Sequence, residues 1–155
     1  FHMLRTLMLD LQTRSEGRFT AMIRDFHESY RGRSVTTDQF RQLVERHAGV
    51  PMDWFFDAWI KGTAIPTYRV AWTAEQAPEG KYRVRLRVTQ EGVPTEFKQF
   101  VLVSADLGNQ RFAHFRLGVS GGQTEYLSPL LPSAPKGLTF NELHSVLADV
   151  KTERW

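Results

Sequence analysis

The stretch Asp53–Val70, which reads DWFFDAWIKGTAIPTYRV, constrains the fold more than any other part of the sequence. Its first half places Trp and Phe side chains on one helical stripe and leaves charged side chains outside it. Gly62 has the position of a left-handed residue that ends a helix, and Pro66 favours extended backbone before it. From Tyr68 onwards, apolar and polar residues alternate with the period of a strand. The stretch therefore predicts a change from helices to sheet.

Four short helices are predicted up to this change. The first opens the sequence, the second runs from about Gly17 to Arg31, the third lies between Thr36 and Gly49, and the fourth is the first half of the stretch above. Thr36 and a Gln three residues later fit a capping box, and Gly49 is placed to end the third helix. Because the connections are only a few residues long, we expect these helices to pack as a helical subdomain over residues 1–62.

The first helix lacks a capping residue. Leu4, Leu7, Met8 and Leu11 have helical spacing, but no Ser, Thr, Asp or Asn precedes them. We therefore expect the sequence to be a fragment whose first helix starts upstream. We also expect the apolar residues of this helix to be exposed and to promote self-association.

Residues 63–155 predict a β-sandwich. Apolar alternation recurs at short intervals, separated by turns rich in Gly, Pro and Asn, and six or seven strands can be counted. This number suits an immunoglobulin-like or fibronectin-like sandwich. Residues 140–150 fit either a helix or a closing strand. The predicted strands that follow the one at Tyr68 are 82–88, 97–104, 111–119 and 125–131.

Composition excludes several classes of function. The 155 residues contain no cysteine, so a disulfide framework, a thiolate metal site and a cysteine nucleophile are all excluded. No apolar run reaches the roughly 18 residues of a transmembrane helix, and no signal-peptide pattern is present. The net charge of +3 is spread along the chain. Arg83, Arg85 and Arg87 could follow phosphates along one strand face, but no aromatic residue alternates with them, so a solvated outer face is favoured and nucleic-acid binding is not expected.

No complete active site can be assembled from the sequence. His27-Glu28-Ser29-Tyr30-Arg31 begins like the zinc signature HExxH, but Arg31 stands where the second histidine is required. Asp53 and Asp57 lie one helical turn apart and could act as an acid–base pair, although acidic residues near a helix N-terminus are common for electrostatic reasons alone. The aromatic set Trp54, Trp59, Tyr68 and Trp72 is more typical of a core than of a ligand site. We therefore predict no catalytic, metal-binding or cofactor-binding residue in this chain.

Two stretches resemble the aminopeptidase N-like zinc metallopeptidases, the gluzincin aminopeptidase family. FHMLR at residues 1–5 is similar to the helix that follows the catalytic tyrosine in that family. The second stretch is similar to the helical end of the family's catalytic domain and the start of its β-sandwich. It comprises TTDQF at 36–40, Gly49, DWFF at 53–56, Trp59, Gly62 and IPTYRV at 65–70. The resemblance covers residues 1–72 and, more faintly, Val146–Ala148, which is similar to a closing strand.

The resemblance implies a parent enzyme that removes N-terminal residues from peptides with one Zn²⁺. The metal would be held by an HExxH helix and a glutamate on the next helix, all upstream of Phe1. Residues 1–62 would then be the C-terminal end of a thermolysin-like catalytic domain, and residues 63–155 the sandwich. The chain alone would bind no catalytic zinc and hydrolyse no peptide. Its partner would be the N-terminal remainder of its own polypeptide, and family analogy suggests a secreted or periplasmic parent.

Two other functions stay open at this stage. The chain could be a stand-alone β-sandwich binding module for a protein or nucleic-acid partner. Within a full enzyme, it could also act as a lid or scaffold that narrows the substrate cleft.

Overall fold

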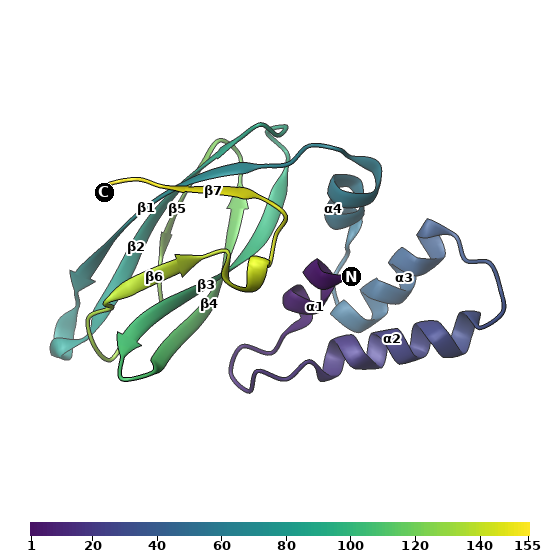
Figure 1. Ribbon diagram of the computed structural model, residues 1–155, viewed down its shortest axis with the longest axis horizontal. Coiled ribbons are helices and arrows are strands. Elements are labelled where there is room, and N and C mark those ends of the chain that lie inside the picture. The colour runs from purple at the N-terminus through teal and green to yellow at the C-terminus, as the bar shows by residue number, and fades with distance from the viewer. The chain divides into compact units, whose positions relative to one another are not determined.

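The computed structural model describes residues 1–155 and confirms the mixed α+β fold class. The chain divides into two compact units, Phe1–Thr63 and Ala64–Trp155, and the division falls within the stretch Asp53–Val70. All four α-helices belong to the first unit and all seven strands to the second (Figure 1). We call them the helical unit and the sheet unit.

The helical unit surrounds a single apolar core. Its elements are α1 (His2–Met8), α2 (Gly17–Tyr30), α3 (Thr37–Ala48), α4 (Asp53–Phe56) and a π-helical turn, η1 (Asp57–Lys61). Each large apolar side chain that leaves water contributes about 1.5–3 kcal/mol, which is why these short helices are stable together and not singly. The fully enclosed residues are Leu4, Met8, Met22, Leu43, Val44, Met52, Phe55 and Phe56.

The start of the chain differs from the prediction. α1 ends at Met8, and the Asp10 carboxylate accepts the backbone N–H groups of Gln12 (2.9 Å) and Thr13 (2.8 Å), which forms a turn where the predicted helix continues. Leu4 and Met8 are 2% and 4% exposed. The expectation that they are exposed is therefore wrong, because α1 contributes them to the core of its own unit.

The ends of α3 confirm the sequence prediction. Thr36 accepts the backbone N–H of Gln39, and the Gln39 side chain accepts the backbone N–H of Thr36, which completes a capping box. Gly49 has a φ of 74° and ends the helix in the left-handed conformation.

Gly62 ends the last helical turn in a different way from the one predicted. Its φ and ψ are −87° and 164°, so the backbone is extended and not left-handed. A Cβ atom here would lie 2.7 Å from the carbonyl oxygen of Ala58 and 2.9 Å from that of Asp57. Glycine is required because the backbone passes so close to the carbonyls of the π-helical turn.

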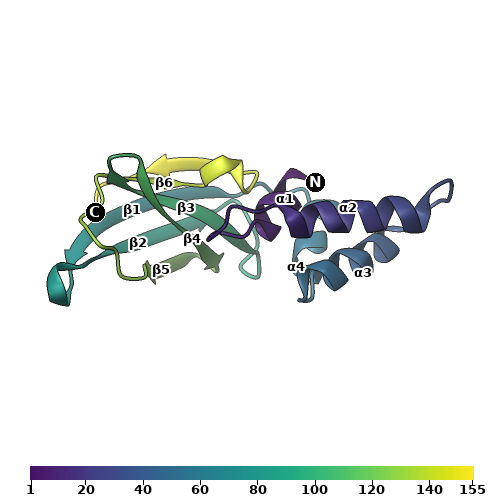
Figure 2. The same cartoon turned by 90° about the horizontal axis from the view of Figure 1, so that it is seen from below.

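The sheet unit contains two sheets, which Figure 2 shows from below. The first has the order β5-β2-β1-β7 and the second the order β4-β3-β6. All pairs are antiparallel except β1 with β7, which is parallel. The strands are β1 (Thr67–Gln76), β2 (Tyr82–Glu91), β3 (Lys98–Gly108), β4 (Arg111–Ser120), β5 (Gln123–Leu127), β6 (Gly137–Phe140) and β7 (Asp149–Thr152).

Aromatic pairs join the two sheets. Tyr68 of β1 meets Phe140 of β6 edge to face at 5.5 Å, and Phe115 of β4 stacks on Tyr126 of β5 at 5.5 Å. The strand period predicted from Tyr68 onwards is confirmed, because inward residues of β1 and β2 such as Val70 and Leu86 are buried.

The ambiguous segment 140–150 is not a helix. β6 ends at Phe140, a short 3₁₀ turn, η3, covers Glu142–His144, and β7 begins at Asp149. The closing strand therefore starts after Val146–Ala148, the stretch that the resemblance assigns to it. The reason lies in the backbone of the turn, where Asn141, Leu143 and His144 have φ values of 61°, 58° and 50°, a left-handed conformation that interrupts both helix and strand.

Candidate functional site

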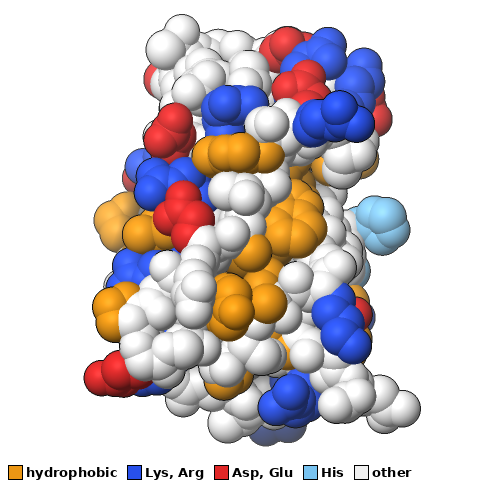
Figure 3. Space-filling model, turned by 90° about the vertical axis from the view of Figure 1, so that its left-hand side faces the viewer, with side chains coloured by type: hydrophobic (Ala, Val, Ile, Leu, Met, Phe, Trp, Pro, Cys, Tyr) orange, Lys and Arg blue, Asp and Glu red, His pale blue; other side chains and the backbone are white.

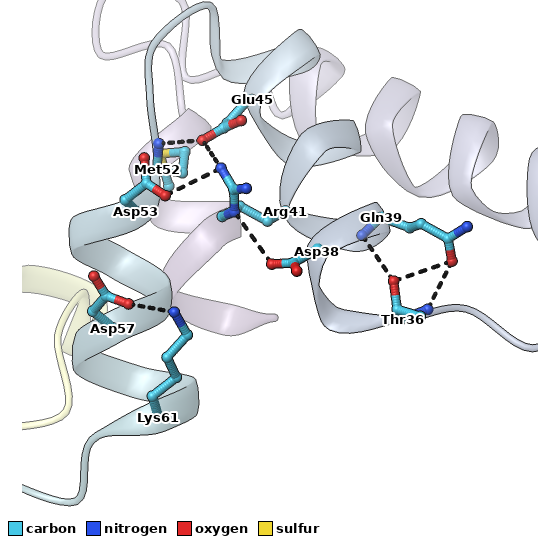
Figure 4. A network of polar contacts seen from close by, with 9 residues as sticks. All are labelled: Thr36, Asp38, Gln39, Arg41, Glu45, Met52, Asp53, Asp57 and Lys61. Atoms are coloured by element: carbon cyan, nitrogen blue, oxygen red, sulfur yellow. Dashed lines mark hydrogen bonds and ion pairs between the residues drawn. The ribbon is translucent and has the colours of Figure 1, made fainter.

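The densest polar cluster of the helical unit is centred on Arg41 of α3 (Figure 4). Its guanidinium lies 2.9 Å from the Glu45 carboxylate, 3.1 Å from that of Asp53 and 3.8 Å from that of Asp38. Arg41 and Glu45 face each other because residues four apart share a helix face. These carboxylates raise the pKa of Arg41, with the hydrogen bond to Glu45 as the largest cause.

Glu45 connects this cluster to the start of α4. Its carboxylate accepts the backbone N–H of Met52 at 2.9 Å, in addition to the bond from Arg41. The Met52 N–H is the main reason that the pKa of Glu45 is lowered, and Arg41 adds to the effect. Both partners favour the charged form of Glu45, and its two bonds fix the start of α4 against α3.

The two aspartates considered as an acid–base pair have separate partners. Asp53 binds Arg41, whereas Asp57 binds Lys61 one turn further on, at 2.8 Å. Figure 4 shows both contacts on the same side of α4 and η1. The two aspartates are ion-paired with different cations, so the structural interpretation of this pair fits better than the catalytic one.

The histidines of the helical unit do not form a metal site. His27 is exposed on α2, and no second histidine stands beside it on that helix. His47 of α3 lies 2.8 Å from the Asp25 carboxylate, which also accepts a hydrogen bond from Ser29 at 2.9 Å. These hydrogen bonds, with that of His47 the largest cause, lower the pKa of Asp25. Asp25 stands between the imidazole and the hydroxyl, so this trio cannot activate Ser29 as a nucleophile.

In the row of arginines on β2, one is ion-paired and another packs over an aromatic ring. Arg85 binds Glu75 through two nitrogen atoms, at 2.6 and 3.2 Å. Arg87 lies over the ring of Trp155, 5.2 Å from its centre. No aromatic residue alternates with the arginines along β2 itself, but the chain end brings Trp155 to Arg87. Figure 3 shows acidic, basic and hydrophobic side chains intermingled on the face of the sheet unit that it presents, with no continuous basic surface.

A second polar cluster lies beside β6 in the sheet unit. His114 of β4 and Glu142 of the turn η3 are 2.9 Å apart, and both are largely buried. Asn141 stabilises the turn. Its side-chain NH₂ donates to the carbonyl of Val146 at 2.9 Å, and its side-chain oxygen accepts the N–H of the same residue at 2.9 Å. Ser145 then accepts the backbone N–H of Leu102 on β3.

These contacts stabilise an unfavourable backbone. Three non-glycine residues of the turn, Asn141, Leu143 and His144, have a left-handed backbone conformation. Each costs about 1–3 kcal/mol. The side chains of Asn141, Glu142 and Ser145 offset that cost by fixing the turn to the sheet formed by β4, β3 and β6. The cluster is therefore built to hold a connection between the two sheets.

The residues that sequence reasoning singled out are not brought together into one site. No group of three or more His, Cys, Asp or Glu side chains is close enough to hold a metal ion. No helix combines the length and apolar character that crossing a membrane requires. The clusters missed by sequence reasoning, around Arg41, Asp25 and His114, join different elements. Within them, the i, i+4 spacing of Arg41 with Glu45 and of Asp25 with Ser29 is visible in the sequence.

The comparisons with known proteins add no relative. No protein-family model matches the chain, and no curated protein matches it.

Proposed function

We propose that the chain is the C-terminal portion of a zinc-dependent aminopeptidase of the aminopeptidase N-like class, and that its own role is structural. In this proposal the helical unit ends a thermolysin-like catalytic domain, and the sheet unit is an immunoglobulin-like or fibronectin-like sandwich. The zinc ligands and the tyrosine that stabilises the oxyanion belong to the upstream part of the polypeptide. The parent enzyme removes N-terminal residues from peptides.

One observation carries the proposal: several of the residues on which the resemblance rests make architectural contacts. Thr36 and Gln39 cap α3, and Gly49 ends it. Asp53 binds Arg41, and Gly62 occupies a place without room for a side chain. A pattern of caps, chain reversals and core residues is what a structural segment would share with its family.

The stretch between the units supports the same reading. Phe55 and Phe56 are buried in the helical unit, and Tyr68 and Val70 are buried in the sheet unit. Only about ten residues connect these two pairs, and they include the π-helical turn, Gly62 and Pro66. One end of the stretch is therefore buried in the core of the helical unit and the other in the core of the sheet unit, as a junction between a catalytic domain and a bracing domain requires.

The test compares two proteins. The first is the product of the full reading frame around the codon for Phe1, and the second is residues 1–155 alone. We expect the upstream frame to encode HExxH, a following glutamate and a Tyr-x-Lys-Gly element. We also expect the longer protein to hydrolyse leucine arylamides until a chelator removes its zinc, and residues 1–155 to be inactive with zinc added. Chelator-sensitive hydrolysis by residues 1–155, or a frame that begins near Met3, contradicts the proposal.

A stand-alone binding module is the second candidate, and one observation favours it. Residues 64–155 form a compact unit with a core of their own, as a recognition domain would. Nucleic acid is the less suitable partner, because Arg85 is ion-paired and Arg87 is stacked on Trp155. Fluorescence anisotropy with labelled single-stranded DNA at 50 and 200 mM salt tests this point, and a steep loss of binding with salt would support the nucleic-acid form of the module.

A further inference from the structure

An apolar hollow lies at the C-terminal end of α2, within the helical unit. It encloses about 480 Å³, and most of its lining surface is apolar. The residues that matter for its chemistry are Phe1, Ile23, Phe26, Tyr30, Arg31 and Arg33. The volume is within the range of about 300–1,000 Å³ that small-molecule sites occupy. Figure 2 shows the loop that leaves α2 at this end and returns to α3.

The aromatic wall of the hollow is fixed by ring contacts. Phe26 packs against Tyr30 at 5.7 Å and against Phe40 of α3 at 5.1 Å, and Phe1 packs against Phe40 at 5.6 Å. The rings thus hold one another, and a ligand would not have to order them. Phe26 and Tyr30 are only half-buried, so part of their ring surface is available to a ligand.

Two arginines, Arg31 and Arg33, are among the residues that line the same hollow. Arg31 and Arg33 are both exposed, and neither has an acidic side chain within 4.0 Å. Gly32 between them has a φ of 70°, which reverses the chain at the end of α2, and the N–H of Arg33 donates to the carbonyl of Tyr30 at 2.9 Å. The reversal brings both arginines to the border of the hollow.

We propose that this hollow binds a small carboxylate that carries an aromatic or aliphatic tail. The tail would lie against the rings of Phe26 and Tyr30, and the carboxylate would be held by Arg31 and Arg33. A guanidinium presents a planar fork of donors that matches the two oxygens of a carboxylate, and such charge-assisted bonds are about twice as strong as neutral ones. An amine would be repelled by the same groups, and a neutral ligand would gain only the apolar contact. The proposal makes no use of the zinc chemistry of the proposed parent enzyme.

The test uses three probes of equal length that differ in charge: 4-phenylbutyrate, 4-phenylbutan-1-ol and 4-phenylbutylamine. Each is titrated into the ¹⁵N-labelled chain and followed by amide chemical shifts. We expect the carboxylate to bind at least about tenfold more tightly than the alcohol, the amine not to bind, and the shifts to centre on residues 23–35. Tenfold corresponds to about 1.4 kcal/mol, near the lower limit for one hydrogen bond to a charged group.

Two matched double variants separate recognition from bulk charge. Arg31→Gln with Arg33→Gln removes both guanidiniums of the hollow, whereas Arg18→Gln with Arg24→Gln removes the same charge elsewhere on α2. We expect the first pair to bring the affinity for the carboxylate down to that of the alcohol, and the second pair to change it less than twofold. Amide shift dispersion confirms that both are folded. Equal affinity for all three probes, or an equal loss in both double variants, overturns the proposal.

Discussion

The hydroxyl of Tyr68 offers the sharpest test of how the sheet unit is stabilised. Tyr68 is 0% exposed, its ring packs against Phe140, and its hydroxyl has no hydrogen-bond partner. A buried polar group without a partner costs about 1–3 kcal/mol of desolvation. Tyr68→Phe removes the hydroxyl and keeps the ring, and the void it leaves is smaller than a methyl group, which costs below about 1 kcal/mol. We therefore expect the variant to be more stable by about 1 kcal/mol.

The same hydroxyl predicts how stability depends on pH. Burial raises the pKa of Tyr68 well above its usual value. In the unfolded chain a tyrosine ionises near pH 10, whereas folded Tyr68 keeps its proton, so the unfolded state binds fewer protons above that pH. The stability of the native protein therefore falls by about 1.36 kcal/mol for each further pH unit. Tyr68→Phe removes this contribution, and its advantage over the native sequence should widen above pH 10.

Thermal unfolding of the chain, followed by circular dichroism at pH 7 and pH 11, measures both effects. For a unit of this size 1 kcal/mol corresponds to about 4–8 °C in Tm. Tyr126→Phe is the control, because Tyr126 also packs against a phenylalanine ring, that of Phe115, but is only partly buried. A Tyr68→Phe variant that is less stable at pH 7 would refute the reasoning, since it would mean that the hydroxyl makes a bond that stabilises the fold.

Three further substitutions test the contacts described above. Gly62→Ala places a Cβ 2.7 Å from a backbone carbonyl, so we expect a loss of about 1–3 kcal/mol in urea unfolding. Gly122→Ala, where a Cβ would meet nothing, should cost less, and equal losses would contradict the steric reason. Glu45→Gln should lower the urea midpoint at pH 7, and the difference from the native chain should shrink as the pH falls below about 4.3, the ordinary pKa of glutamate. The reason is that a carboxylate with a lowered folded pKa adds stability above its unfolded pKa and loses it as the pH falls through the folded one. A difference that persists unchanged at pH 3 would argue against this charge effect. Asn141→Ala removes three hydrogen bonds and leaves a non-glycine residue at a φ of 61°, so we expect a loss of about 2–4 kcal/mol in Tm-derived free energy. Asn141→Gly should cost less, since it relieves the backbone, and two variants as stable as the native chain would exclude the role given to this side chain.

Local features of the fold could be predicted well from the sequence. The capping box of Thr36 and Gln39 and the left-handed Gly49 each depend on residues within about four positions, so the sequence pattern contains all the groups involved. The alternation of β1 and β2 was visible for the same reason, because one buried face imposes a period of two.

Features that depend on packing between elements could not be predicted in this way. Gly62 lies where a glycine usually ends a helix, but its conformation follows from a π-helical turn that no residue pattern predicted. Asp25 and His47 are 22 positions apart, and His114 and Glu142 are 28 apart. Their contacts exist only once helices or strands have packed, so spacing along the chain contains no signal for them.

The parallel pairing of β1 with β7 has a consequence for how the protein is made. Thr67 pairs with Asp149, and the N–H of Glu153 donates to the carbonyl of Val70. One edge of β1 is therefore paired only after β7 has been synthesised. The helical unit, by contrast, contains only contacts among residues 1–63. During synthesis the helical unit can fold while the rest is still being translated, whereas the edge of β1 stays open until residue 153 has left the ribosome. A chain that lacks residues 149–153 would therefore expose an unpaired, aggregation-prone edge of β1.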